Sequence, residues 1–355
     1  MRDAIVYSGW TWETFNVPER IALALTHLGA RVLYCGSPVS IFRHGDSRLH
    51  EVEPGIFAFR PSFGSARLNK LSFLQSIQAR FVAKQILERA VSLQLRNPIF
   101  FYPCLGDRLS LLSHFRGKFF LAHMQMDYGE LSAEDHVRAS DITLAIPHSV
   151  YHQQRARFGE KVQLIPQVLD LRHFQAADGA SLEPSPALNS IPHPRLGYLG
   201  PAYQQVNKPL INELLQLRPD WHFVSVGPHK TLPLPNVHAL PWQSNRELLK
   251  YAKGFDVGFM PYDCFAEEKL HCLPLKLFEY FALGLPVVAT PILELREFRD
   301  LVYLGDTAKE LEQAVKLALQ ESPDSPKRCR RIEIAQRHSI QDLADVLSKA
   351  LPLND

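Results

Sequence analysis

Long apolar runs are missing from this chain. No stretch of its 355 residues approaches the ~18 consecutive apolar residues that a membrane-spanning helix needs. The chain opens directly on a short apolar segment, MRDAIVYSG, with no leader-like run before it. We therefore expect a protein that is neither secreted nor membrane-spanning.

Cysteine is scarce. The five cysteines are scattered, odd in number, and no two of them form a C-x-x-C pair. This pattern argues against both a disulfide framework and a zinc site. It fits a reducing compartment, so the expected location is cytoplasmic.

A large excess of one charge is also missing. Lys and Arg total 39 against 37 Asp and Glu, a net charge of +2, which is too small to indicate a nucleic-acid partner. Residues 1–180 carry 20 Lys and Arg against 16 Asp and Glu, and the remainder carries 19 against 21. Hydrophobic residues make up 46% and charged residues 21%, which is typical of a soluble globular protein, and the length suits two domains.

The most informative segment that is present spans residues 276–290, KLFEYFALGLPVVAT. Apolar residues recur three or four positions apart from Leu275 to Leu283, and Gly284 is a helix stop before a short β-branched run. The segment therefore predicts a helix that passes through a glycine into a buried strand.

The start of this helix is a candidate phosphate site. Pro274 precedes it, and Leu275, Lys276 and Leu277 form its first turn, where free backbone N–H groups favour an anion. Glu279 follows one turn later in an otherwise apolar helix, and a buried carboxylate without partners is costly. The arrangement suits a nucleoside diphosphate whose ribose hydroxyls meet Glu279. Alternatively, Glu279 caps or salt-bridges a helix in some other α/β protein.

The first 35 residues predict a βαβ unit. A strand at 4–7, a helix from Pro18, a stop at Gly29 and a strand at 31–35 indicate a parallel doubly wound sheet. In such a sheet, ligands lie beyond the carboxyl ends of the strands.

The loop after this first strand holds two tryptophans and an acid. Trp10 and Trp12 suit stacking on the flat apolar face of a sugar ligand, or they simply pack on the sheet edge. Glu13 lies between them and the helix.

A histidine ends a later predicted strand. The run FFLAHM places His123 at the carboxyl end of that strand, with Asp127 shortly after it. This is where a doubly wound fold places its ligands. A position in the crevice and a hydrogen-bonded position in the core are both open for His123.

A linker rich in Pro, Ser and Ala at 181–194 precedes a second βαβ series. Gly200 ends the first strand of this series, where a glycine lets the backbone approach a phosphate. Lys208, further along the chain, either supplies a positive charge to that phosphate or is a plain surface lysine. Later crevice loops carry Trp242 and Tyr262. Trp242 borders a nucleobase or caps the next helix.

The region 60–96 is basic and amphipathic. It carries seven Lys or Arg residues and one acidic residue, Glu88, among interleaved apolar residues. Such a stretch suits either an anionic membrane surface, as on the inner face of a membrane, or plain solvent exposure.

Two segments carry a family resemblance. The segment 276–290 resembles the donor-binding signature of GT-B fold glycosyltransferases in the family-4-like group (glycosyl transferases group 1), of the bacterial cell-surface polysaccharide type. Glu279 matches the second glutamate of their E-x7-E motif, and His271 stands in the place of the first. The 36 residues from Ala139 to Phe174 are similar to another segment of that family nearly position by position.

The resemblance implies a GT-B fold, in which two doubly wound Rossmann-like α/β domains face a central cleft. It implies an acceptor-binding domain at 1–180, a nucleotide-sugar-binding domain at 195–334, and a last helix near 335–355 that packs back on the first domain. The implied reaction moves a sugar from a nucleoside diphosphate sugar to a glycan, a lipid-linked saccharide or a small molecule, with retention of configuration.

The resemblance also implies roles for charged residues. Lys208 and Lys276 would meet the charge of the leaving diphosphate. No Asp-x-Asp cluster stands in a suitable loop, so neither an essential metal ion nor a cofactor is expected. An inverting reaction would need a base, and the candidates are His123, Asp127 and Glu13.

His271 departs from the family pattern. A cationic histidine would suit an acidic donor sugar, whereas a shifted loop that uses Glu267 or Glu268 as the missing carboxylate is a simpler account. The same departure leaves open a catalytically inactive, donor-binding partner subunit. A nucleotide-sugar epimerase on the same fold is a further alternative.

Overall fold

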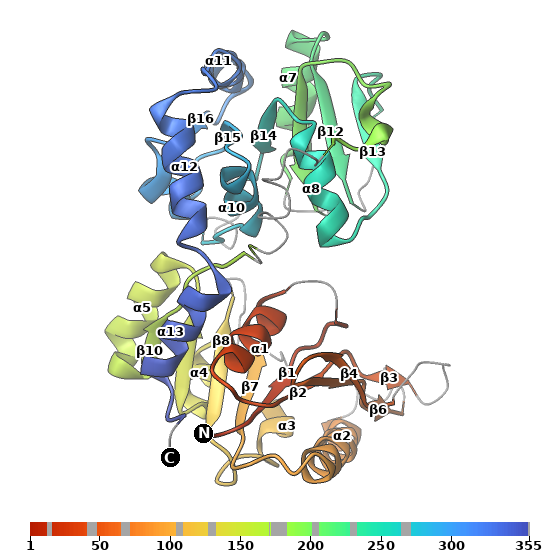
Figure 1. Ribbon diagram of the computed structural model, residues 1–355, viewed down its shortest axis with the longest axis vertical. Helices are drawn as coiled ribbons and strands as arrows, with labels where there is room; N and C mark the ends of the chain where they lie inside the picture. Colours follow the sequence, from red (N-terminus) through yellow and green to blue (C-terminus); the bar gives the residue numbers. More distant parts are fainter. Residues whose placement is uncertain are drawn as a thin grey trace. The chain divides into compact units, whose positions relative to one another are not determined.

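A computed structural model shows a chain of two compact units (Figure 1). It describes residues 1–12, 16–40, 48–64, 72–103, 109–126, 133–169, 171, 183–200, 206–227, 233–263 and 271–353. Unit 1 is Met1–Pro166 together with Ile340–Asp355, and unit 2 is Gln167–Ser339.

Unit 1 is built on an eight-stranded sheet in the order β10-β9-β8-β7-β1-β2-β5-β4. The strands are β1 (Ala4–Tyr7), β2 (Val32–Cys35), β4 (His50–Glu53), β5 (Ile56–Phe59), β7 (Ile99–Pro103), β8 (Leu121–Gln125), β9 (Ile142–Ala145) and β10 (Val162–Leu164). Neighbours pair in parallel except β4 with β5. The separate strands β3 (Val39–Ser40) and β6 (Ser62–Phe63) pair with each other.

Helices accompany this sheet along the chain. They are α1 (Val17–His27), α2 (Ser72–Ser92), α3 (Leu109–Leu112), α4 (Ala133–Ala139), α5 (His148–Phe158), the 3₁₀ turn η3 (Gly159–Lys161) and α13 (Ile340–Ala350). The central strands are apolar throughout because helices cover both faces of a parallel sheet. The C-terminal helix α13 packs beside α1, so the end of the chain belongs to unit 1 (Figure 1).

Unit 2 holds an all-parallel six-stranded sheet in the order β13-β12-β11-β14-β15-β16. Its strands are β11 (Arg195–Leu199), β12 (His222–Val226), β13 (Val237–Leu240), β14 (Val257–Met260), β15 (Val287–Ala289) and β16 (Val302–Leu304). This order is that of a doubly wound nucleotide-binding sheet, with its direction of growth reversing between β11 and β14. The expectation of doubly wound α/β units is confirmed.

The helices of unit 2 are α7 (Lys208–Leu217), α8 (Asn245–Lys253), α10 (Leu275–Ala282), α11 (Ala308–Leu319) and α12 (Pro326–Gln336), with 3₁₀ turns η4 (Pro186–Leu188) and η5 (Leu293–Phe298). Apolar residues of α7 and α11 pack on one face of the sheet and make its main core. Helix α12 runs beside α10 (Figure 1).

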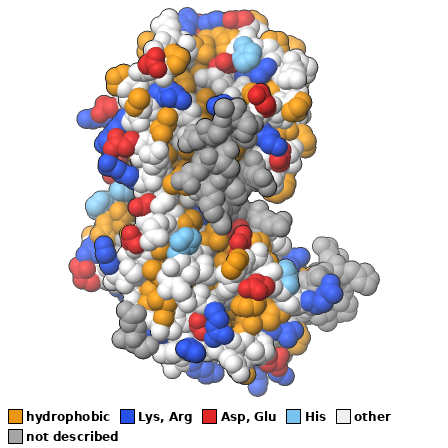
Figure 2. Space-filling view, viewed as in Figure 1, with side chains coloured by type: hydrophobic (Ala, Val, Ile, Leu, Met, Phe, Trp, Pro, Cys, Tyr) orange, Lys and Arg blue, Asp and Glu red, His pale blue; other side chains and the backbone are white. Residues whose placement is uncertain are grey.

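The surface is mixed in character. On the face drawn in Figure 2, charged side chains of both signs are interspersed with apolar ones. Among the helices that the structure describes, none is long and apolar enough to cross a bilayer.

Candidate functional site

The carboxyl ends of β11 and β14 flank the point where the strand order of unit 2 reverses. Doubly wound sheets bind their ligands beyond the strand ends at such a point. β11 runs into Gly200, and β14 runs through Pro261 into Tyr262. The predicted residues Gly200 and Tyr262 therefore lie at the carboxyl edge of this sheet, the edge at which folds of this type bind ligands.

Two glycine turns approach each other closely at this edge. Gly200 follows β11 with φ +96°, and Gly227 follows β12 with φ +136°, both in the region that favours glycine. A Cβ on Gly227 would lie 2.8 Å from the backbone carbonyl atoms of Gly200. Any larger residue at Gly227 would push the two turns apart. Glycine at this position therefore allows the two backbone turns to approach each other closely.

Helix α10 forms as the sequence predicts. Pro274 is its N-cap, at φ −72° and ψ 132°, and the helix runs from Leu275 to Ala282. Gly284 adopts φ +68° and leads through Pro286 into β15. The predicted passage from helix through glycine into a buried strand is confirmed.

Lys276 extends from the first turn of α10 towards the glycine turns. Its ammonium Nζ lies 3.7 Å from the ring centroid of Tyr198 and 5.3 Å from that of Tyr262. A Cβ placed on Gly200 would be 3.9 Å from the same Nζ. The structure thus brings together the predicted residues Lys276, Gly200 and Tyr262, with the lysine ammonium beside the Gly200 turn.

Tyr280 fixes the end of β11 against α10. Its hydroxyl donates to the carbonyl oxygen of Gly197 at 3.0 Å and accepts from the N–H of Leu199 at 3.0 Å. Burial raises the pKa of Tyr280 well above its ordinary value, so the phenol stays neutral. The bonds to β11 hold the approach to Gly200 rigid.

Lys208 begins α7 close to the same edge. The Asn207 side chain accepts a hydrogen bond from the N–H of Leu210 and caps this helix. The N–H of Asn207 donates to the Pro261 carbonyl at 2.8 Å, which ties the helix start beside the end of β14.

The remaining donor-side candidates are placed as follows. Glu279 is half-buried on α10, and His271 is half-buried in the segment before it. Trp242 is exposed beyond β13. Leu275 is half-buried on the first turn of α10, whereas Pro274 is buried.

Leu277 also lies on the first turn of α10, and its side chain is fully buried. Its N–H also donates to the Pro274 carbonyl, at 3.2 Å.

His123 requires a correction. β8 continues to Gln125, so His123 sits within the strand rather than at its end, and its ring is fully buried. The ring stacks on His136 with centroids 5.3 Å apart and lies 5.4 Å from the Tyr102 ring. Burial, together with the neighbouring His136, lowers the pKa of His123 well below its ordinary value. An accessible crevice position for His123 is therefore wrong.

Other acceptor-side candidates lie in the loop after β1. Trp10 is exposed, while Trp12 meets the ring of Tyr34 edge-on at 5.0 Å. Trp12 is half-buried against this ring of β2, whereas Trp10 is the more exposed of the two tryptophans. Glu13 and Asp127 lie outside the described residues, as do Glu267 and Glu268.

Sequence reasoning missed two tyrosines of this site, Tyr198 and Tyr280. A tyrosine in an otherwise aliphatic buried strand, as in RLGYLG, is the signal that could have identified Tyr198. Nothing in the spacing of Tyr280 predicts its bonds to β11.

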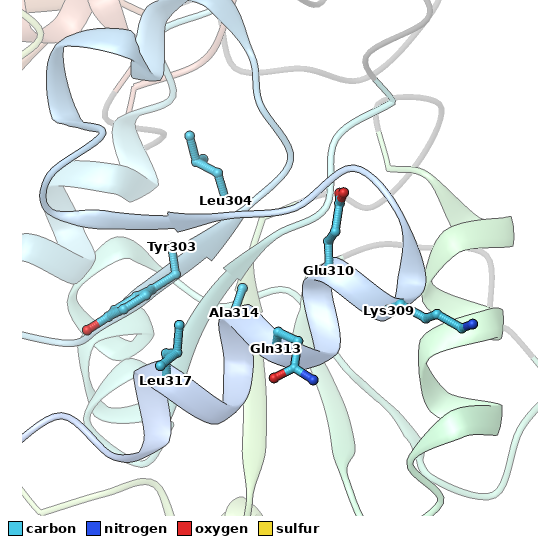
Figure 3. Close-up of a pocket in the computed structure, with 7 residues that line it drawn as sticks. All are labelled: Tyr303, Leu304, Lys309, Glu310, Gln313, Ala314 and Leu317. Atoms are coloured by element: carbon cyan, nitrogen blue, oxygen red, sulfur yellow. The ribbon is translucent and has the colours of Figure 1, made fainter.

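A separate surface pocket of unit 2 lies over β16 and α11 (Figure 3). Its lining residues are Tyr303, Leu304, Lys309, Glu310, Gln313, Ala314 and Leu317. It contains none of the predicted site residues, and β16 is the outermost strand of the sheet, two positions from β14. Within the described part of the chain, no three His, Cys, Asp or Glu side chains are grouped to hold a metal ion.

Comparison with known proteins locates a family match on unit 2. Residues 193–321 match the family model described as "Glycosyl transferases group 1". Over 104 residues the chain is 36% identical to "Putative teichuronic acid biosynthesis glycosyltransferase TuaH" of Bacillus subtilis (strain 168). This aligned segment covers 27% of this chain and 26% of that protein. The chain therefore spans about a quarter of the length of this curated relative.

Solved structures match the whole chain. The E. coli structure described as "Trehalose-6-phosphate from E. coli bound with UDP-2-fluoro glucose" superposes with a TM-score of 0.69 at 10% identity, covering 98% of this chain and 99% of that one. A UDP-forming trehalose-phosphate synthase from Burkholderia xenovorans gives 0.68 at 12% identity and covers 100% of both chains. At such identity the likeness concerns the fold alone, and it confirms the expected GT-B fold.

Proposed function

We propose that this protein is a glycosyltransferase whose unit 2 binds a nucleoside diphosphate sugar. The observation that carries the proposal is the position of the Lys276 ammonium, beside the Gly200 turn and at the first turn of α10. A glycine turn, a helix N-terminus and a lysine are three independent features that favour a phosphate. The group 1 glycosyl transferase match covers all three.

The proposed donor lies with its diphosphate at Lys276 and the Gly200 turn. Glu279, one turn further along α10, accepts hydrogen bonds from the ribose hydroxyls, and Lys208 at the start of α7 adds a second charge. In the reaction the bond between the sugar C1 and the diphosphate oxygen breaks. The acceptor hydroxyl oxygen bonds to C1, its proton passes to the leaving diphosphate oxygen, and the fixed charges stabilise the leaving diphosphate.

The proposed acceptor is a glycan or a lipid-linked saccharide, bound by unit 1. Support comes from the curated relative, which is described as acting in teichuronic acid biosynthesis. Trp10 offers an exposed ring at a strand end of unit 1, suited to the apolar face of a sugar. We further propose retention of configuration, as the family resemblance implies, and independence from metal ions, because no Asp-x-Asp cluster stands in a suitable loop of the sequence.

Unit 1 also offers a surface for an anionic membrane, on the outward face of α2. Ile77 and Phe81 are 50% and 47% exposed there, and Arg80 and Lys84 stand exposed on the same stripe. Exposed apolar side chains flanked by cations are typical of helices that lie on anionic lipid. Docking on the inner face of a membrane would bring the enzyme to lipid-linked acceptors.

A panel of nucleoside diphosphate sugars tests the proposal. One donor should raise the melting temperature, because a ligand that binds only the native state stabilises it by mass action. That donor, incubated with a saccharide panel in the presence of EDTA, should release its nucleoside diphosphate and yield a new glycoside. A panel in which no donor shifts the melting temperature would contradict the proposal.

The same samples separate the alternatives. An epimer formed from donor alone would identify an epimerase. Donor binding without turnover on any acceptor would identify an inactive partner subunit. This alternative arises because His271 stands in the place of the first motif glutamate.

A further inference from the structure

We propose that Tyr198 and Tyr262 are positioning residues that hold the Lys276 ammonium at the glycine turns; this inference rests on the proposed function. Tyr198 lies within β11, Tyr262 follows β14, and Lys276 comes from α10. The ammonium stands 3.7 Å and 5.3 Å from the two ring centroids. Both distances are within the range in which a ring face attracts a cation.

The two rings are held by rigid backbone. Tyr198 is hydrogen-bonded in register with Ser225 of β12, in the interior of the sheet. Tyr262 forms a bridge with Val206, and its carbonyl oxygen accepts from the Thr290 hydroxyl at 2.9 Å. The rings meet at 69° with centroids 6.5 Å apart. A lysine on its own is a flexible chain, so fixed rings on two strands reduce the positions open to its charge.

The choice of aromatic rings, rather than a carboxylate, has a chemical consequence. In the described part of the chain no carboxylate pairs with Lys276, and both rings are buried. Burial raises the pKa of Tyr262 well above its ordinary value, so the phenol carries no negative charge. A carboxylate would position the ammonium and also neutralise it. The rings position it and leave its full charge for an incoming phosphate.

A double-mutant cycle on nucleotide binding tests this role. The variants are Tyr198→Leu, Tyr198→Phe, Lys276→Met and the double variant Tyr198→Leu with Lys276→Met. The probe is the nucleoside diphosphate that most stabilises the wild-type protein out of UDP, GDP, ADP, CDP and dTDP, with its nucleoside as a control that lacks phosphate. Titration calorimetry gives the dissociation constants.

We expect Tyr198→Leu to weaken diphosphate binding about tenfold and to leave nucleoside binding unchanged. Tyr198→Phe keeps the ring face and should stay within about twofold of wild type. In the Lys276→Met background, Tyr198→Leu should cause no further loss of diphosphate affinity, because the ammonium that Tyr198 positions is absent. An equal loss in both backgrounds would overturn the inference, since the ring would then act without the lysine.

Tyr262→Leu provides a second variant with the same expectation in case Tyr198→Leu folds poorly. If no nucleoside diphosphate binds the wild-type protein, the proposed function fails, and the cycle is read instead from the free energy of unfolding. A coupling between Tyr198→Leu and Lys276→Met in that measurement supports the ring contact. Strict additivity there would overturn it.

Discussion

Arg331 of α12 and Glu321 form a buried ion pair beneath the end of α10. The Arg331 Nη1 to Glu321 Oε2 distance is 3.1 Å, and both side chains are almost completely buried. Arg331 also donates to the carbonyl oxygen of Gly284 at 3.2 Å, the glycine that ends the signature helix. Burial would raise the pKa of Glu321, but hydrogen bonds from Arg331, Ser325 and Tyr303 outweigh it and leave the pKa below its ordinary value.

Replacing Arg331 by Met should destabilise the protein by about 3–5 kcal/mol, because it leaves the Glu321 carboxylate buried without its partner. Urea denaturation followed by circular dichroism measures this loss. Arg330→Met is the matched control on the same helix, since its pair with Glu333 is exposed and screened by solvent, and its loss should change the free energy of unfolding little. Equal effects of the two variants would contradict the account.

Replacing Glu279 by Ala should weaken donor binding by ~1.5–3 kcal/mol if the carboxylate accepts the ribose hydroxyls. Calorimetry with the stabilising nucleoside diphosphate gives the loss. A 2′-deoxyribose analogue should bind the variant and the wild type more equally than the ribose form does. Unchanged affinity in a folded Glu279→Ala protein would rule out the assignment.

Reversing charge at Arg80 and Lys84 should reduce binding to liposomes that contain phosphatidylserine, by about 1 kcal/mol per basic residue near the surface. Binding should also fall with rising salt, because exposed charges are screened. Co-sedimentation measures both. The matched double charge reversal is Arg330→Glu with Arg337→Glu, at exposed positions on α12 and at its C-cap. If both double variants bind liposomes as the wild type does, α2 is only a solvated helix.

The buried His123 predicts a pH dependence of stability. Its lowered pKa keeps it neutral in the folded protein, whereas the unfolded chain takes up its proton below about pH 6.5. More protons are then bound in the unfolded state, so stability falls as pH drops below about 6.5, by up to about 1.4 kcal/mol per pH unit for this group.

The variant His123→Leu should make the free energy of unfolding depend less steeply on pH between 6.5 and about 5. His136 keeps part of the slope, because burial lowers its pKa too. His152→Leu, at an exposed position, should retain the wild-type slope. A His123→Leu slope identical to wild type would show that His123 does not carry the effect.

His271→Glu tests why this chain departs from the family pattern. If charge is the reason, the variant should favour a neutral donor sugar over a uronic acid donor, because a carboxylate repels the acidic sugar. Competition between the two donors, with products separated by charge, measures the preference. Unchanged preference together with loss of turnover in Glu268→Gln would instead support the shifted loop.

Local patterns determined much of this protein in advance. Residues 276–290 encode α10, the Gly284 stop and β15 through apolar spacing and one glycine, because these features depend on near neighbours in the chain. Alternation of strands and helices likewise indicated doubly wound sheets, and Pro274 and Lys276 stand at the helix start where the sequence placed them.

Only the tertiary structure decided which distant side chains meet. Tyr198 and Lys276 are far apart in sequence, and they come together because crossovers place β11 beside β14 with α10 at their ends. The local sequence around His123 indicates a position in the crevice. In the structure, however, β8 is an interior strand between β7 and β9, and His123 is buried within it. The physical reason is common to both: parallel strands take their neighbours through crossovers from remote parts of the chain, so contacts across strands leave no local pattern in the sequence.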